Sequence, residues 1–369
     1  MKTKIKKLAI LVMACAMTFS VLTLTGCNDE TQDDPTDVTE SSETDIDEND
    51  VTEPVDVPIN LENVYEPALM ERLNKSFTID GNTITQAEYN FFYVTAYTEF
   101  STYAYAGYYP ATYSGFLDLE ADCEYLADEG GKWGDFLDTQ VKREIQKVYI
   151  MNDLAQDVGL ALTEEDLESM DATVEMIENE AQANSIEADR YLAQHYGEDM
   201  SIALFTQIME KNFLANSYYD YYLSNYEFDE DEVMLPTVRH ILFPAEREAA
   251  EDEIAEARSL AEDVMSEVSE YQDMVLVGDR ETTAERAAES AEYTVQLGQL
   301  VQELDDWCFD SEREEGDLDI IQTRFGFHVV YFVGMTEASE TQKARIAEAT
   351  LSGILDERAT SDRFILVPA

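Results

Sequence analysis

Residues 221–243, YYLSNYEFDEDEVMLPTVRHILF, join two kinds of sequence. Before the acidic run 229–232 the pattern is that of a tyrosine-rich helix. After it, Pro236 restarts the chain as extended structure, because the residue before a proline disfavours the helical conformation. A short strand carrying Arg239 and His240 follows. We therefore predict a first domain over residues 61–235, a second over residues 236–336, and a C-terminal segment over residues 337–369.

The second domain has the predicted order strand, helix, irregular middle, helix, strand. Apolar residues recur at helical spacing over residues 254–268 and predict a helix with one face packed on a small sheet. Residues 323–334, TRFGFHVVYFVG, contain the closing strand and His328. His240 and His328 are two of the three histidines in the chain.

The phrases RHILF and TRFGFH resemble the two ends of a parvulin-type peptidyl-prolyl isomerase domain, which opens with a HIL-type motif and closes with an FGxH-type motif. The resemblance implies that His240 and His328 meet in the core beneath an active groove. It also implies that Thr323 matches the hydroxyl residue that precedes the FGxH motif. These three side chains are candidate catalytic residues that tune a hydrogen-bond network.

The same resemblance places a groove helix after residues 298–300, GQL. Leu300 stands where the family usually carries Met, and Leu304 where it usually carries Phe, so the groove stays apolar but less aromatic. With Leu300 and Leu304, Phe309 and Phe325 are the expected substrate-binding residues.

The middle of the domain departs from the family, which normally has a tyrosine-serine-x-aspartate (or cysteine) phrase and a GGxLG turn. This chain has VGDRE at residues 277–281 and AEYTV at residues 291–295, without a double glycine. Asp279 or Glu281 fits the acidic position, and we place Asp279 in the candidate catalytic set. This departure leaves a non-catalytic holdase chaperone as the alternative to an active isomerase.

The first domain opens with a hairpin signal, Asp80-Gly81, between two short β-prone segments. Residues 85–88, TQAE, then have the pattern of a capping box, and helical patterns continue to residue 225. The order of these segments resembles the helical N-terminal chaperone region of exported parvulin-type foldases of the PrsA and SurA group. That resemblance implies that residues 337–369 return as a helix and tail to complete this domain, with a disordered end as the alternative. The predicted class is α+β, a mostly helical domain plus a small domain whose partly antiparallel sheet is flanked by helices.

Residues 1–26 have the pattern of a lipoprotein signal peptide. Four lysines, at positions 2, 4, 6 and 7, precede an apolar run over residues 8–24, and LTGC at residues 24–27 forms a lipobox. Processing leaves a lipidated Cys27 as the first residue. The run is shorter than the roughly 20 residues of a spanning helix, although an uncleaved anchor remains the alternative. Either outcome places the chain on the extracytoplasmic face of the cell membrane.

Residues 27–60 are rich in Asp, Glu, Ser, Thr and Pro, and no Lys or Arg occurs between Cys27 and Arg72. Such a segment buries too little apolar surface to order itself, so we predict a disordered acidic tether. The whole chain has 80 Asp and Glu against 23 Lys and Arg, a formal net charge of -57. This balance excludes nucleic acid as a partner, because phosphate binding requires a basic surface.

No metal or cofactor site is expected, since the chain lacks a cysteine and histidine spacing typical of zinc sites and a glycine-rich phosphate loop. After lipidation of Cys27, Cys123 and Cys308 remain, and both a disulfide and two buried thiols are compatible with the sequence.

The resulting hypothesis is a membrane-anchored foldase that binds unfolded exported polypeptides and isomerises X-Pro bonds. A third possibility, a solute-binding or adhesive surface lipoprotein, shares the signal peptide and tether.

Overall fold

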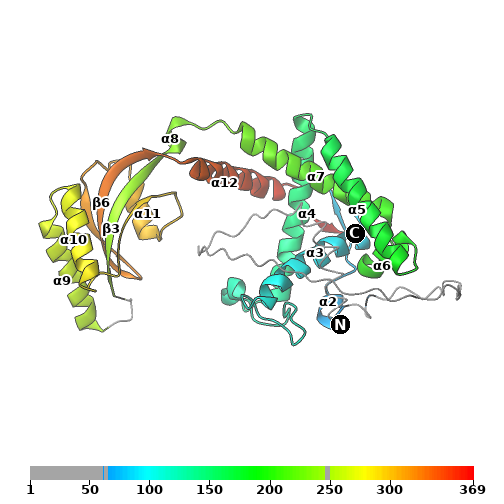
Figure 1. Cartoon of the computed structure of the whole chain (residues 1–369), viewed down its shortest axis with the longest axis horizontal. Helices are drawn as coiled ribbons and strands as arrows, with labels where there is room; N and C mark the ends of the chain where they lie inside the picture. Colours follow the sequence, from blue (N-terminus) through cyan, green and yellow to red (C-terminus); the bar gives the residue numbers. More distant parts are fainter. Residues whose placement is uncertain (1–60, 62–64, 246–249) are drawn as a thin grey trace, which may run out of the picture. The chain divides into compact units, whose positions relative to one another are not determined.

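The computed structural model describes residues 61, 65–245 and 250–369. The signal peptide, the lipidation site Cys27 and the acidic tether that the sequence predicts lie outside these residues. The chain divides into two compact units (Figure 1). Unit 1 contains the described residues up to Tyr221 together with Gly353–Ala369, and unit 2 contains Tyr222–Ser352. Unit 2 is thus an insertion between two parts of unit 1.

Unit 1 is mostly helical. Its helices are α2 (Pro67–Met70), α3 (Gln86–Tyr105), the 3-10 helix η2 (Glu124–Glu129), α4 (Trp133–Asp157), α5 (Glu164–Ala183), α6 (Ala188–Tyr196) and α7 (Ile202–Asn225), whose last turn belongs to unit 2. The first half of α3 is buried on nearly all sides, with Tyr89, Phe91, Phe92 and Tyr93 each at most 2% exposed. Large aromatic side chains therefore form much of the core of this unit.

A small sheet begins unit 1. Strands β1 (Phe77–Ile79) and β2 (Asn82–Ile84) pair antiparallel. The two residues between them, Asp80 and Gly81, have φ angles of 47° and 73°, as a tight hairpin turn requires. The predicted hairpin is confirmed.

The start of α3 is confirmed as well, but one contact differs from the prediction. Thr85 caps the helix by accepting a hydrogen bond from the Glu88 backbone N–H. The Glu88 side chain lies in the core, where its carboxylate is 2.7 Å from Lys211 Nζ and accepts a hydrogen bond from the Tyr149 hydroxyl. A buried charge needs such a partner, so tertiary pairing overrides the local capping box.

The C-terminal end of the chain is part of unit 1. Helix α12 (Glu340–Ala359) enters this unit at Gly353, and strand β7 (Val367–Pro368) adds to β1, giving the order β2-β1-β7. Arg363 forms ion pairs with Asp80 and Asp153 at 2.6 and 2.5 Å.

Unit 2 is built on a four-stranded antiparallel sheet of order β4-β3-β6-β5. Its elements are α8 (Glu230–Val233), β3 (Met234–Pro244), α9 (Glu251–Glu267), α10 (Tyr271–Thr283), β4 (Glu289–Thr294), α11 (Gln302–Cys308), β5 (Leu318–Thr323), β6 (Gly326–Glu337) and the first part of α12. The α+β class predicted from the sequence is confirmed.

The two faces of this sheet are covered by different helices (Figure 1). On one face Ile241 and Val329 belong to a core cluster with residues of α9 and α10. On the other, Val238 and Val330 pack with residues of α11. Successive side chains of a strand point to opposite faces, so this division fixes the side of the residues from Val238 to the end of β3 and from the start of β6 to Phe332. The pairing of these two strands shifts register between Thr237 and Val238.

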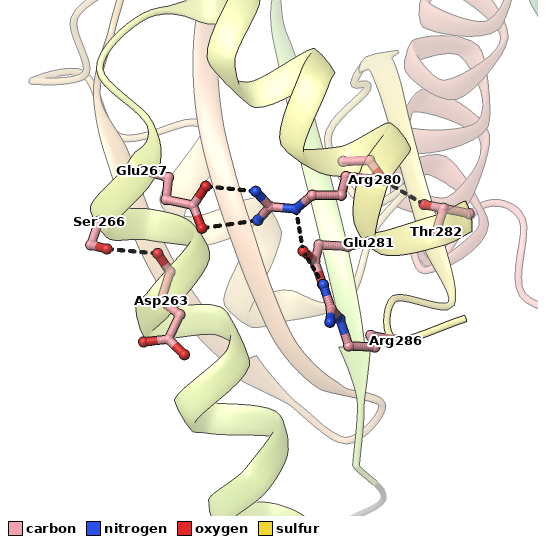
Figure 2. Close-up of polar contacts among 8 residues, drawn as sticks. Asp263, Ser266, Glu267, Arg280, Glu281, Thr282 and Arg286 are labelled. Carbon is pink, nitrogen blue, oxygen red and sulfur yellow. Dashed lines mark hydrogen bonds and ion pairs between the residues drawn. The ribbon is translucent and has the colours of Figure 1, made fainter. Parts of the chain in front are cut away.

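An ion-pair network joins α9, α10 and the turn before β4 (Figure 2). Glu281, only 2% exposed, accepts a hydrogen bond from Arg280 and two from Arg286. Arg280 also forms a bidentate pair with Glu267 at 2.7 and 2.9 Å. The network holds the end of α10 against α9 and the chain leading to β4.

Cys123 and Cys308 are buried, free thiols, one in each unit. Among the described residues no helix is long and apolar enough to cross a membrane.

Candidate functional site

Two histidines meet on the face of the sheet that α11 covers. His240 in β3 lies opposite Val330, and His328 in β6 lies opposite Leu242. Their Nδ1 atoms are 3.1 Å apart, and their rings stack with an interplanar angle of 12°. Thr323, the last residue of β5, places Oγ1 2.9 Å from His328 Nε2. The antiparallel register of three strands thus brings these three polar side chains together.

The acidic partner of this group is Glu289, the first residue of β4. Its Oε2 lies 3.6 Å from His240 Nε2. The Tyr293 hydroxyl donates a hydrogen bond to the other carboxylate oxygen, and the Tyr293 ring lies 5.4 Å from that of His240. Glu289 is half-exposed at its side chain, 43%, so it connects the buried histidines with solvent.

These contacts indicate one arrangement of protons, which we assign from the hydrogen-bond partners. The Glu289 carboxylate favours a proton on His240 Nε2, which leaves Nδ1 of that ring as an acceptor. His328 then donates from Nδ1 and accepts at Nε2 from the Thr323 hydroxyl. Thr323 Oγ1 in turn accepts the Phe325 backbone N–H at 3.1 Å. In this arrangement the two Nδ1 atoms, His328 Nε2 and Thr323 Oγ1 are all hydrogen-bonded without a charge on either ring. His240 Nε2 has no partner within hydrogen-bond distance and faces the Glu289 carboxylate at 3.6 Å.

Burial keeps both imidazoles neutral. Burial, together with a smaller effect of the neighbouring His240, lowers the pKa of His328 to about 4. Burial also lowers the pKa of His240, although the charge of Glu289 opposes this effect. His328 is therefore neutral over the pH range in which an unperturbed histidine becomes charged, and burial shifts His240 in the same direction.

We expect His328 to remain neutral at pH 5.5 in the folded chain. Its folded pKa lies below the unfolded value, so the stability that it contributes is complete above about pH 6.5 and is lost as pH falls toward 4. The full effect amounts to about 3 kcal/mol. An NMR titration of the three imidazoles measures the midpoint directly.

A His328→Gln variant is the control for the stability effect. Between pH 7 and pH 5 its free energy of unfolding should fall less than that of the wild type, because the carboxylates titrate alike in both proteins. An NMR midpoint near 6.5 for His328 would contradict the assigned neutral pair.

The predicted substrate-binding residues differ in their access to solvent. Leu304 is 5% exposed and belongs to the core beside Trp307. Leu300 and Phe309 are half-buried and pack against the same core, whereas Phe325 is 47% exposed in the turn between β5 and β6. Leu300, Phe309 and Phe325 are thus at least partly open to solvent, whereas Leu304 lies in the core against which Leu300 and Phe309 pack.

Asp305 holds the segment that carries Leu300. Its carboxylate accepts the backbone N–H groups of Gly298 at 2.7 Å and Leu300 at 3.3 Å. Gly298 has φ +81°, a conformation that glycine adopts without strain. These contacts fix the position of Leu300 in front of α11.

Asp279, the fourth candidate catalytic residue, is exposed on α10. This helix packs on the sheet face opposite the histidines through Met274 and Val277. The structure therefore brings together His240, His328 and Thr323, but not Asp279. The acidic group nearest to His240 is Glu289.

Sequence reasoning missed Glu289, Tyr293 and Asp305. The alternation of residues 289, 291 and 293 places them on one face of β4, opposite Leu242, His240 and Val238. Once the pairing of β4 with β3 is known, this alternation identifies Glu289 and Tyr293 as neighbours of the histidine. The pairing itself has no local sequence signal in this chain.

Comparison with known proteins agrees with the motifs at the two ends of the domain. The family model of the PPIC-type PPIase domain, Rotamase, matches residues 240–334. This range begins at His240 and contains both histidines, Thr323 and α11. The search of curated proteins gives no match.

Several solved structures are similar at low identity. The peptidylprolyl isomerase PrsA from Bacillus cereus has 15% identity and a TM-score of 0.30, over 65% of this chain and 86% of that chain. The foldase PrsA from Lactococcus lactis has 14% identity and a TM-score of 0.22, over 79% and 88%. A SurA-like chaperone from Campylobacter jejuni has 10% identity and a TM-score of 0.16, over 77% and 91%. The family match confirms, for residues 240–334, that this chain carries a domain of the parvulin-type peptidyl-prolyl isomerase family.

Proposed function

We propose that this chain is an extracytoplasmic foldase, which binds unfolded exported polypeptides and catalyses the cis-trans isomerisation of X-Pro bonds in them. The observation that carries the proposal is the neutral pair of His240 and His328 with Thr323, next to apolar side chains that are partly open to solvent, in a domain that matches the PPIC-type family. The proposed anchor is a lipid on Cys27, which rests on the sequence of residues 1–27 alone.

The chemistry asked of the site is modest. Rotation about an X-Pro bond faces a barrier of about 18 to 20 kcal/mol because amide resonance must be broken. No bond to the enzyme forms, so neither a nucleophile nor a cofactor is required. Catalysis needs only tighter binding of the twisted bond than of either planar form.

Each part of the site contributes to that difference. Leu300, Phe309 and Phe325 hold the proline ring on an apolar surface. The histidines and Thr323 form a floor of fixed dipoles without net charge. Because these dipoles are already oriented, they reorganise little when the charge on the X-Pro carbonyl and nitrogen is redistributed during rotation. Glu289 positions this floor by setting the tautomer of His240.

The test is an isomerisation assay on a short X-Pro peptide with the full chain in neutral detergent. Wild type should accelerate exchange, and Leu300→Ala should lower kcat/KM about ten-fold, as expected for methylene groups lost from an apolar site. Glu289→Gln should lower kcat and change its pH profile with little change in KM, because the residue acts through His240. Leu276→Ala removes a 61% exposed leucine from α10, on the opposite sheet face, and serves as the matched control.

A second readout separates the alternatives. The same samples are tested for suppression of aggregation of an unfolded client protein. If wild type leaves the exchange rate unchanged but suppresses aggregation, the enzymatic proposal is wrong and the chain is a holdase. Variants that lose activity should keep the wild-type circular dichroism spectrum, which excludes unfolding as the cause.

A further inference from the structure

A cluster of aromatic rings connects α3 with the beginning of α4 in unit 1. Neighbouring centroids in it are between 4.6 and 6.2 Å apart. The cluster consists of Phe100, Tyr103, Tyr109, Tyr125, Trp133 and Phe136. Trp133 is 1% exposed, whereas Tyr103 and Tyr125 are 44% and 49% exposed. The cluster thus extends from the core to the surface.

Three more exposed tyrosines lie in the chain between Tyr103 and Tyr125. Tyr105, Tyr108 and Tyr113 are 83%, 76% and 109% exposed. Together with Tyr103 and Tyr125 they form what we call the tyrosine surface. Tyr105 covers the turn that carries Tyr113, because a Cβ at Gly115 would lie 3.1 Å from Tyr105 Cδ2. Aromatic rings gathered at the surface in this way are typical of interaction sites.

Hydrogen bonds fix the backbone that carries these rings. The Thr112 N–H donates to Phe116 O at 2.8 Å, and the Leu117 N–H donates to Ser101 Oγ at 3.0 Å. Further along, the Trp133 N–H donates to Ala121 O at 3.1 Å. The backbone that carries the rings is therefore already ordered, so little conformational entropy of this backbone is lost when a ligand binds.

Carboxylates predominate in the chain that carries the tyrosine surface. Residues 76–131 contain no Lys, Arg or His. Glu120, Asp122 and Glu124 are exposed within this stretch. The next cation in the chain, Lys132, is paired with Asp122 at 2.5 Å. Ring faces and carboxylates both attract cations, so the surface is complementary to positive charge.

We propose that the tyrosine surface binds Lys- and Arg-bearing segments of unfolded polypeptides. This inference rests on the proposed foldase function and adds the chemical class of segment and the place where it binds. The cationic side chains lie over tyrosine rings, while Glu120 and Glu124 supply long-range attraction. Such contacts depend on charge rather than on a particular sequence, as a binder of many clients requires.

The test is a fluorescence anisotropy titration of the full chain, in neutral detergent, with three labelled peptides. All three lack proline, so the isomerase site does not select them. They share one unstructured sequence and differ only at a fixed set of positions. These positions are Lys and Arg in the cationic peptide, Gln in the second and Glu in the third. We expect the cationic peptide to bind at least about ten-fold more tightly than the Gln peptide, and the Glu peptide to bind most weakly.

Two variants locate the contact. The triple variant Tyr105→Ser, Tyr108→Ser and Tyr113→Ser should weaken cationic-peptide binding about ten-fold, since it removes three exposed rings from an intact backbone. Glu120→Gln with Glu124→Gln should weaken the same binding and flatten its salt dependence. The matched control is Leu167→Ser with Leu276→Ser, which removes exposed apolar side chains elsewhere and should leave the affinity unchanged.

The outcomes separate this inference from the proposed function. Equal binding of the cationic and Gln peptides would overturn the inference, as would unchanged affinity of the triple tyrosine variant. Isomerase activity should be unchanged in that variant. A result that overturns the inference about the tyrosine surface therefore does not contradict the isomerase proposal. Conversely, charge-selective binding that depends on the tyrosines would support the inference even if the wild type failed to accelerate X-Pro exchange.

Discussion

Gly326→Ala is expected to destabilise unit 2 by about 4 kcal/mol or more. Gly326 begins β6 with φ +138°, and a Cβ there would lie 2.2 Å from Phe243 O and 2.7 Å from Ala245 N. Both are backbone atoms, one in β3 and one directly after its last residue, where β3 pairs with β6. They cannot move without breaking the pairing that also positions His328. Denaturant unfolding in a Trp133→Phe background measures the loss, because Trp307 then reports on unit 2 alone.

Gly334→Ala is the matched control. Gly334 also lies in β6 and has φ +135°, but a Cβ there would have no neighbour within 4 Å. This variant introduces backbone strain but no steric clash, and it should lower the free energy of unfolding by only about 1 to 3 kcal/mol. Equal losses for the two variants would show that the contact with β3 is not the cause.

Glu281→Gln is expected to lower the free energy of unfolding of unit 2 by about 2 to 3 kcal/mol. The change weakens the three hydrogen bonds from Arg280 and Arg286 to a carboxylate that is 2% exposed (Figure 2). Both arginines are about half-exposed. Water therefore hydrogen-bonds to their guanidinium groups in the variant, and this reduces the loss of stability. The same Trp307 fluorescence measurement applies.

Glu267→Gln is the comparison for this network. It removes the pair between Glu267 and Arg280, in which both side chains are nearly half-exposed, and should lower the free energy of unfolding much less than Glu281→Gln does. The pH dependence gives a further check. Arg286 and Arg280 hold the pKa of Glu281 below its usual range, so its contribution is complete above the unfolded value of about 4.3 and is lost as pH falls below it. A Glu281→Gln loss as small as that of Glu267→Gln would mean that burial adds nothing to the network.

The features predicted correctly from the sequence are those with a local or family signal. Asp80-Gly81 marks a turn because few residue pairs adopt its φ angles, and the structure confirms the hairpin. RHILF and TRFGFH mark the ends of the domain that the family model matches. The α+β class follows from the same patterns.

The remaining features depend on pairings between distant residues. Glu289 becomes a neighbour of His240 only because β4 pairs with β3 in one register. Glu88 has a capping pattern, but Lys211, far along the chain, decides where its carboxylate lies. Asp279 was placed by analogy with a phrase that this chain lacks, and no local pattern shows which sheet face α10 covers. The catalytic roles of His240, His328 and Thr323 stay predictions until the isomerisation assay is done.

The return of the C-terminal segment to β1 has a consequence for how the chain becomes folded as it is made. Thr78 pairs with Val367, so unit 1 closes only after residue 367 has been synthesised. Unit 2 is continuous in sequence, and its sheet can form while the last helix is still being added. A protein proposed to protect incomplete chains thus passes through an incomplete stage of its own, in which the inserted domain is ready before the domain that surrounds it in sequence.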